Sequence, residues 1–321
     1  MAAISISRPL VAAPPATATP LVGAGIGLGA LAFGLFTVMD TLIKWLSAGY
    51  PVIELLFSNA LFALIPVALT TLRRGGLARL RTRRLPLHVV RGTFGLCGGF
   101  LGFYAYSQLP LADAYSIIFA TPLLITALSV PVLGEQVGWR RWSAVALGFA
   151  GVLVMLQPGV APIGPGALAA LGAACASAVA ILLVRRLSAT ESTASIALYS
   201  NLTVVLVTGC LLPFDFVLPT WSDLLLMAAS GLIGGTALLI LIGAYRRAPA
   251  ALVAPFQYSQ MVWAILLGFL IWGDVPDPAK LLGAAIVAGS GLFIVYRETA
   301  LGRRPTASLH PSAAAARPSA P

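Results

Sequence analysis

Charged residues are scarce in this sequence. They make up 9% of its 321 positions, against roughly 25% in a typical soluble domain. A soluble protein of this length needs a polar surface that so few charged side chains cannot supply. In contrast, 59% of the residues are hydrophobic, and they come in runs of about 20, the length that a helix needs to cross a bilayer. The sequence therefore predicts an integral membrane protein.

Cysteine and histidine are also scarce, with three and two copies. Cys97, Cys175 and Cys210 all lie within apolar runs and no CxxC pair is present, so neither a disulfide nor a metal site is predicted. The histidines lie at the start of a predicted helix, His88, and in the C-terminal tail, His310. We expect no metal, no cofactor and no catalytic residue.

Sequence motifs for ATP hydrolysis and for nucleic-acid binding are absent. No stretch reads GxxxxGK[ST], so ATP is not expected to drive an activity. The net charge of +10 does not indicate a nucleic-acid partner, because the polar segments are too short to form a binding domain. Residues 1–20 lack the pattern of a cleaved signal peptide. They and residues 299–321 are predicted to be disordered cytoplasmic tails.

Ten apolar segments follow one another along the chain. Each has about the length of a spanning helix, so we predict an all-α polytopic membrane protein with ten transmembrane helices. The segments cover residues 23–46, 52–72, 89–108, 112–133, 141–157, 165–185, 193–212, 222–244, 250–272 and 279–296.

Lysine and arginine are distributed unevenly between the connections. With ten spans, every basic residue except Lys44 and Lys280 falls on one side of the membrane. Cytoplasmic loops hold the excess of lysine and arginine. The sequence therefore predicts an inner (plasma) membrane protein with both termini in the cytoplasm.

A short frame, Ala-Tyr-x-x-x-Pro-x-Ala, occurs at residues 105–112 and again at 244–251. The similarity continues without a gap to a glycine that an acidic residue follows in each copy, Gly134-Glu135 and Gly273-Asp274. Each half then holds five segments, and an odd number forces the second half to enter the membrane from the opposite side. We predict two inverted repeats, over residues 21–159 and 163–298.

The sequence around these landmarks resembles the drug/metabolite transporter superfamily, in its EamA-like ten-helix branch. The resemblance is carried by Arg91, the first frame, Pro122, Gly134-Glu135, Pro255-Phe256-Gln257-Tyr258 and Gly273-Asp274-Val275-Pro276. It implies two bundled five-helix halves around a central cavity, with alternating access. One departure is Phe57-Ser58-Asn59, where many relatives place an arginine early in the second span.

We therefore expect a secondary transporter of a small polar or amphipathic metabolite, such as an amino-acid derivative, an S-adenosylmethionine-like compound, a flavin or a drug. A proton, an exchanged solute or the substrate gradient itself are the open choices for coupling. The alternatives are an intramembrane enzyme and a receptor or pore. The expected partners are the substrate and the lipid bilayer.

Few ionisable residues lie within the predicted spans, where they are costly and often functional. Asp40 and Lys44 are four apart on the first segment, so they share a helix face and can pair. They either line the cavity and bind an ionic group, or form a structural pair with Lys44 reaching the outer interface. Glu54 opens the second segment, where it either exchanges protons, meets Lys44 or has no role.

Uncharged polar and aromatic residues within the spans are further candidates for substrate contact. A small-molecule site typically combines an aromatic wall with a few polar groups, whereas the alternative for each polar residue is a hydrogen bond between helices. Pro122 is included because a proline removes a backbone donor and can kink its helix. The candidates are Asn59, Thr121, Pro122, Gln257, Tyr258, Gln260 and Trp263.

Overall fold

The computed structural model describes residues 19–76, 82, 84–133, 138–156, 163–187, 190–247 and 253–300. Over these residues the chain is helical and contains no strand. Six of the described helices are long and apolar enough to cross a membrane, and three shorter apolar helices accompany them. The predicted tails and the Gly134-Glu135 pair lie outside the described residues, apart from the inner ends of the two tails.

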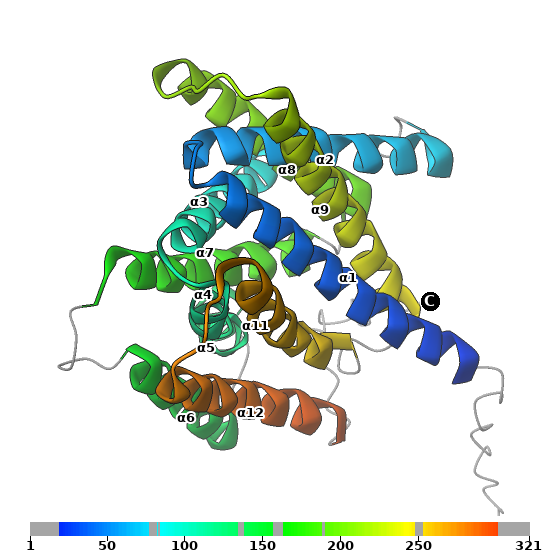
Figure 1. Ribbon diagram of the computed structural model, residues 1–321. Coiled ribbons are helices and arrows are strands. Elements are labelled where there is room, and N and C mark those ends of the chain that lie inside the picture. The colour runs from blue at the N-terminus through cyan, green and yellow to red at the C-terminus, as the bar shows by residue number, and fades with distance from the viewer. Residues whose placement is uncertain are drawn as a thin grey trace, which may run out of the picture.

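The helices closely follow the predicted apolar segments (Figure 1). The first half contains α1 (Thr19–Leu46), α2 (Val52–Gly75), α3 (Leu85–Gln108), α4 (Leu111–Ile118), α5 (Thr121–Leu133) and α6 (Trp139–Leu156). The second half contains α7 (Pro165–Leu187), α8 (Thr193–Leu211), η3 (Leu212–Phe214), α9 (Trp221–Arg247), η4 (Ala254–Tyr258), α11 (Ser259–Trp272) and α12 (Pro278–Ala300).

Two of the predicted segments are interrupted part-way. In the fourth, α4 ends at Ile118 and α5 begins at Thr121, directly before Pro122. In the ninth, the 3-10 turn η4 contains Pro255 and leads into α11. A proline lacks the backbone N–H that a continuous helix requires. The kink expected at Pro122 is therefore found, and Pro255 lies at a second interruption.

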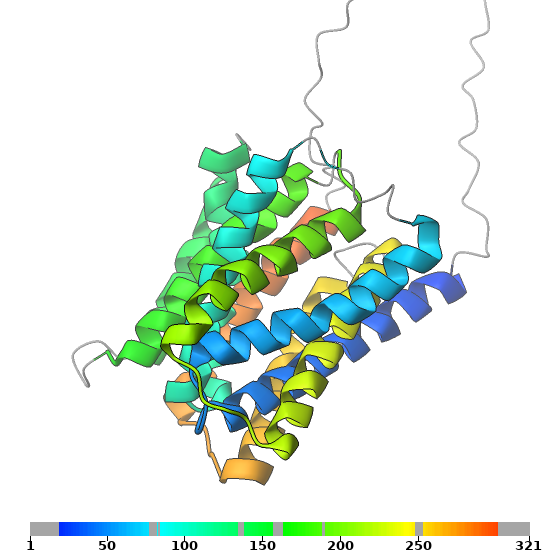
Figure 2. The ribbon, with the colours of Figure 1, turned by 90° about the horizontal axis from the view of Figure 1, so that it is seen from above.

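The start of α1 and the end of α12 lie at one end of the bundle, which we call the tail end (Figure 2). The opposite end carries the connections 47–51, 109–110, 215–220 and 273–277, and we call it the far end. At the far end, Tyr50 donates a hydrogen bond to Asp223 over 2.7 Å. At the tail end, Thr82 donates to Glu191 over 2.9 Å. Both contacts join the two halves of the chain.

Helices of the first half pack mainly against helices of the second. The principal pairs are α1 with α9, α3 with α7, α6 with α12, and α2 with both α8 and α9. Small residues let helix backbones approach closely in a membrane. Where α6 crosses α12, a Cβ added at Gly283 would lie 2.6 Å from the Gly151 carbonyl oxygen. The crossing therefore depends on the absence of side chains at both glycines.

Replacing Gly283 with alanine should destabilise the protein by about 1–3 kcal/mol, because the added methyl group overpacks the crossing. Gly289 lies on the same helix with open space around its Cα, so Gly289→Ala is the matched control. Thermal unfolding in detergent micelles measures the difference. Equal melting temperatures for the two variants would contradict this account of the crossing.

Candidate functional site

A buried carboxylate lies at the centre of the bundle. Asp40 of α1 is 5% exposed, and its Oδ2 accepts hydrogen bonds from the hydroxyls of Tyr106 on α3, at 3.4 Å, and Tyr115 on α4. Gln260 of α11 in turn lies with its Nε2 3.5 Å from the Tyr115 hydroxyl. A charged group is costly to bury without hydrogen bonds. Here α3 and α4 of the first half donate to the carboxylate, and α11 of the second half contacts one of the two donors.

Four aromatic rings extend from this carboxylate, and we call Tyr106, Tyr115, Phe119 and Tyr258 the aromatic file. The ring centroids of Tyr106 and Tyr115 are 5.8 Å apart, and those of Tyr115 and Phe119 are 5.9 Å apart. Phe119 then meets Tyr258 edge-to-face at 5.2 Å. Separations of about 4.5–7 Å are those at which aromatic pairs attract one another. The file thus forms a continuous aromatic surface that ends in the second half.

The last two rings of the file occupy matching places in the chain. Phe119 follows Pro110 by nine residues, and Tyr258 follows Pro249 by nine residues. Each ring therefore lies at the interruption of its segment. The Tyr258 hydroxyl reaches α12 at Gly291, where a Cβ would collide with it. A glycine at this position of α12 is what lets Tyr258 adopt its place.

Lys44 does not pair with Asp40, and the predicted ion pair is wrong. Its Nζ donates instead to the backbone oxygen of Leu109 over 2.6 Å and lies 5.1 Å from the centre of the Trp272 ring. The last carbonyls of a helix lack partners within that helix, and Leu109 follows α3 directly. The long lysine side chain reaches this carbonyl at the far end and leaves Asp40 to the tyrosines.

Glu54 lies apart from the central carboxylate. It is 3% exposed, and its Oε2 accepts a hydrogen bond from the Val217 backbone N–H over 3.1 Å. Its Oε1 is buried and has no hydrogen-bond partner among the described residues. Glu54 therefore joins α2 to the connection that precedes α9, and it does not meet Lys44.

The other predicted residues divide between the centre and the periphery. Asn59 lies with its Nδ2 3.4 Å from the Ser230 hydroxyl on α9, which is a contact between helices. Thr121 donates to the Ile118 carbonyl over 2.6 Å and so bridges the interruption between α4 and α5, beside Pro122. Gln257 is half-buried in η4. Trp263 is 44% exposed beside α1 rather than in the aromatic file.

The structure thus connects Asp40, Gln260 and Tyr258 through three residues that sequence reasoning missed, Tyr106, Tyr115 and Phe119. Tyr106 had a signal, because it belongs to the repeated frame. Tyr115 and Phe119 had none beyond their aromatic character. Among the described residues no cluster of three or more histidine, cysteine, aspartate or glutamate side chains could hold a metal ion.

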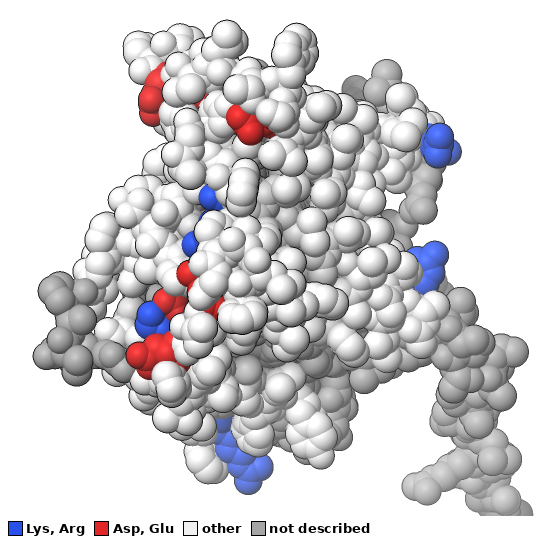
Figure 3. All heavy atoms as spheres, viewed as in Figure 1, with Lys and Arg blue, Asp and Glu red and all other residues white. Residues whose placement is uncertain are grey.

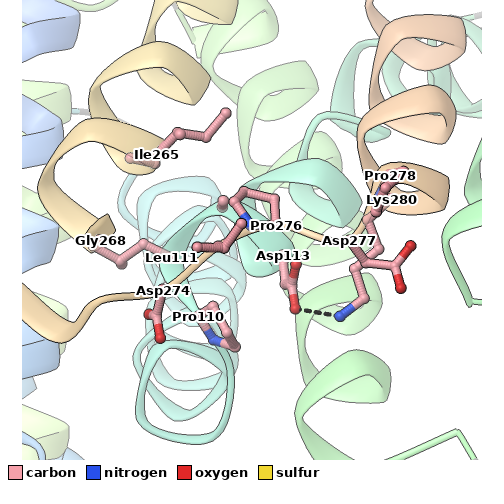
Figure 4. Close-up of a pocket in the computed structure, with 13 residues that line it drawn as sticks. Pro110, Leu111, Asp113, Ile265, Gly268, Asp274, Pro276, Asp277, Pro278 and Lys280 are labelled. Atoms are coloured by element: carbon pink, nitrogen blue, oxygen red, sulfur yellow. Dashed lines mark hydrogen bonds and ion pairs between the residues drawn. The ribbon is translucent and has the colours of Figure 1, made fainter.

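Two hollows lie at opposite ends of the bundle. The far-end cavity, about 400 Å³ in volume, is lined by α4, α11 and the start of α12 (Figure 4). Acidic and basic side chains gather there, whereas most of the visible face is uncharged (Figure 3). The tail-end groove, about 630 Å³, is lined mainly by α2, α8 and α9, with Leu28 of α1 and Ser192. Along α1, Asp40 lies between Leu28, which lines the tail-end groove, and Lys44 at the far end.

Both halves of the chain match one family of proteins. The EamA-like transporter family matches residues 23–157 and 164–296. The chain belongs to this family. The resemblance stated from the sequence is therefore confirmed, and this EamA-like protein is a multi-pass membrane protein and a transporter rather than an enzyme.

Curated relatives of the EamA-like protein are named as transporters of different solutes. It is 28% identical to the S-adenosylmethionine uptake transporter of Rickettsia prowazekii, over 82% of this chain and 89% of the relative. It is 30% identical to the riboflavin transporter of Rhizobium johnstonii, over 84% and 90%. It is 29% identical to the pseudopaline exporter of Pseudomonas aeruginosa, over 83% and 94%.

A solved crystal structure shares the fold of the EamA-like protein. The two chains are 25% identical, and the match covers 88% of this chain and 98% of the other, with a TM-score of 0.61. The helical arrangement is therefore one that a related chain adopts in a crystal.

Replacing Tyr115 with phenylalanine should destabilise the EamA-like protein by about 1–3 kcal/mol, because buried Asp40 loses a donor. Tyr104→Phe on α3 is the control, since no hydrogen bond of the Tyr104 hydroxyl is found within the described part of the chain. Thermal unfolding of the purified variants measures both effects. If the melting temperature of Tyr115→Phe equals that of the wild type, the hydrogen bond to Asp40 contributes nothing to stability.

Proposed function

We propose that this EamA-like protein is a secondary transporter that moves a small polar or amphipathic metabolite across the inner membrane by alternating access. The observation that carries the proposal is the buried carboxylate of Asp40. Tyrosines of α3 and α4 donate hydrogen bonds to it, and the aromatic file connects it to the second half. Polar groups on an aromatic wall are typical of small-molecule sites.

The packing of the helices supports two inverted five-helix repeats, over residues 21–159 and 163–298. When α1, α2, α3, α5 and α6 are exchanged for α7, α8, α9, α11 and α12, the principal contacts map onto one another. The pair α1–α9 becomes α7–α3, the pair α2–α9 becomes α8–α3, and the pair α5–α7 becomes α11–α1. The pairs α6–α12 and α2–α8 map onto themselves. The family match in both halves agrees with this exchange.

This symmetry also supports the mechanism. Repeats of opposite orientation can rock around a site near the middle of the membrane, which opens first to one side and then to the other. Asp40 lies on α1 between Leu28, which lines the tail-end groove, and Lys44 at the far end. In the proposed cycle, a solute bound at the aromatic file exchanges with each hollow in turn.

The distribution of charge supports a cytoplasmic tail end. The basic residues at this end of the described chain include Arg84, Arg140, Arg186 and Arg247, whereas the far end has Lys44 and Lys280. The positive-inside rule then places both termini in the cytoplasm.

Single cysteines test this orientation at Gln108 and Arg247, the two exposed frame residues at opposite ends. The three native cysteines of the protein are first replaced. In intact cells, an impermeant maleimide should then label a cysteine at 108 from outside. A cysteine at 247 should react only after the membrane is permeabilised. Labelling of both from the same side would refute the inverted repeat.

Asp40 is also the proposed binding site of a coupling proton. No lysine or arginine of the described chain pairs with it, so a proton or a positively charged group of the substrate would neutralise it in this apolar setting. The aromatic file suits a planar ring or an onium group. Amino-acid derivatives, S-adenosylmethionine-like compounds, flavins and drugs are therefore the substrate classes that we propose.

Reconstitution into liposomes tests the function directly, with uptake of a panel of these metabolites under imposed pH gradients. Asp40→Asn should slow uptake at least about tenfold, equivalent to about 1.4 kcal/mol of barrier, and should abolish any response to the gradient. Glu54→Gln, which changes a second buried carboxylate, should retain both. If no solute accumulates or exchanges under any gradient, the transporter mechanism proposed here is wrong.

A further inference from the structure

A partly buried ion pair joins the two halves of the chain at the far end. The Nζ of Lys280, on the first turn of α12, lies 2.5 Å from the Oδ2 of Asp113 on α4 (Figure 4). Asp113 is buried, whereas Lys280 keeps part of its side chain in contact with the far-end cavity. Partly buried ion pairs are screened by salt less than fully exposed pairs. The contact therefore fastens α4 to α12 across the boundary between the halves.

A second cation makes a parallel connection nearby. Lys44 of α1 lies over the ring of Trp272, the last residue of α11, while its Nζ donates to the Leu109 carbonyl beside α4. The Trp45 ring also packs against Trp272, with centroids 6.4 Å apart. We call Asp113, Lys280, Lys44 and Trp272 the far-end lock. All of its contacts lie at the far end, where the two halves meet.

The repeat does not reproduce this lock at the tail end. When the two frames are aligned, the first residue of α6, Trp139, corresponds to the first residue of α12, Pro278. In the same alignment Arg141 corresponds to Lys280. The counterpart of Asp113 is Leu252, which carries no charge. The aligned positions thus carry a basic residue at both ends of the bundle, but an acidic residue only at the far end.

We infer that the far-end lock holds the far side of the transport path closed and makes the form that is closed at the far end the resting form of the protein. The inference rests on the proposed alternating access. Opening the far end separates α4 from α12, so the Asp113–Lys280 pair must break and both charges must find water. At the tail end, the polar contacts between the halves within the described chain are those of Glu191 with Thr82 and His88, and none of them joins a lysine or arginine to a carboxylate.

Labelling of the cavity wall tests the lock without any substrate. Ile265 lines the far-end cavity, and Ile265→Cys is placed in a background in which Cys97, Cys175 and Cys210 are replaced by alanine. The protein is reconstituted in nanodiscs, where both ends meet the solvent, and the rate of reaction with a maleimide is measured. Asp113→Asn and Lys280→Met should each raise this rate at least about fivefold, the lower bound of typical couplings between sites.

Two further variants separate the ion pair from other causes. The exchange Asp113→Lys with Lys280→Asp should return the labelling rate toward that of the parent. Asp277→Asn removes a charge from the same cavity wall and should leave the rate unchanged, because Asp277 accepts from the Ala279 backbone N–H of its own helix at 2.7 Å.

A cysteine at Thr236, in the wall of the tail-end groove, distinguishes opening of the far end from general loosening. A faster reaction at 265 with an unchanged or slower reaction at 236 supports the lock. Equal acceleration at both positions, or no acceleration at 265 in either single variant, overturns it. Absence of uptake by the wild type in liposomes, together with the expected labelling, would instead refute the proposed function and leave the lock in place.

Discussion

The hydrogen bond between Tyr115 and Asp40 imposes the arrangement of the centre. A carboxylate in an apolar bundle needs donors that approach it from several directions, and neighbours on its own helix cannot supply them all. The tyrosines come from α3 and α4, and Gln260 of α11 supports Tyr115 from the second half. Tyr115 lies in the last turn of α4, directly before the break that precedes Pro122. The central carboxylate and the interruption of the fourth segment are therefore neighbours.

Much of the fold follows from the sequence, because each helix is determined by residues that are close to one another along the chain. Runs of apolar residues set the positions of the helices, and Pro122 and Pro255 mark the two interruptions. The side-chain partners are not local. Four-residue spacing made Lys44 the expected partner of Asp40, but a carbonyl 65 positions away accepts its hydrogen bond. Spacing along one helix says which residues share a face, and says nothing of what the neighbouring helices present to that face.

The same limit explains why the sequence did not predict the ion pair between Asp113 and Lys280 at the far end. Asp113 has a sufficient local reason to stand where it does, because an acidic side chain in the first turn of a helix is stabilised by the helix dipole. Its partner Lys280 is 167 positions away, and only the packing of α12 against α4 brings the two together. Likewise, the two prolines occupy different positions in the repeat, whereas Phe119 and Tyr258 match. The conserved feature of the two halves is the place of the break rather than the residue that causes it.

The Asp113–Lys280 pair has a consequence for the rate of transport rather than for its direction. A carrier that rests mainly in one form does not for that reason pump, because the ratio of solute concentrations at equilibrium is set by the gradients to which transport is coupled. The bias instead decides which half of the cycle is slow. Exposure of an empty site at the far side would be the costly step, and a solute that eases that step would speed its own exchange. An asymmetric scaffold of this kind is therefore compatible with uptake and with export.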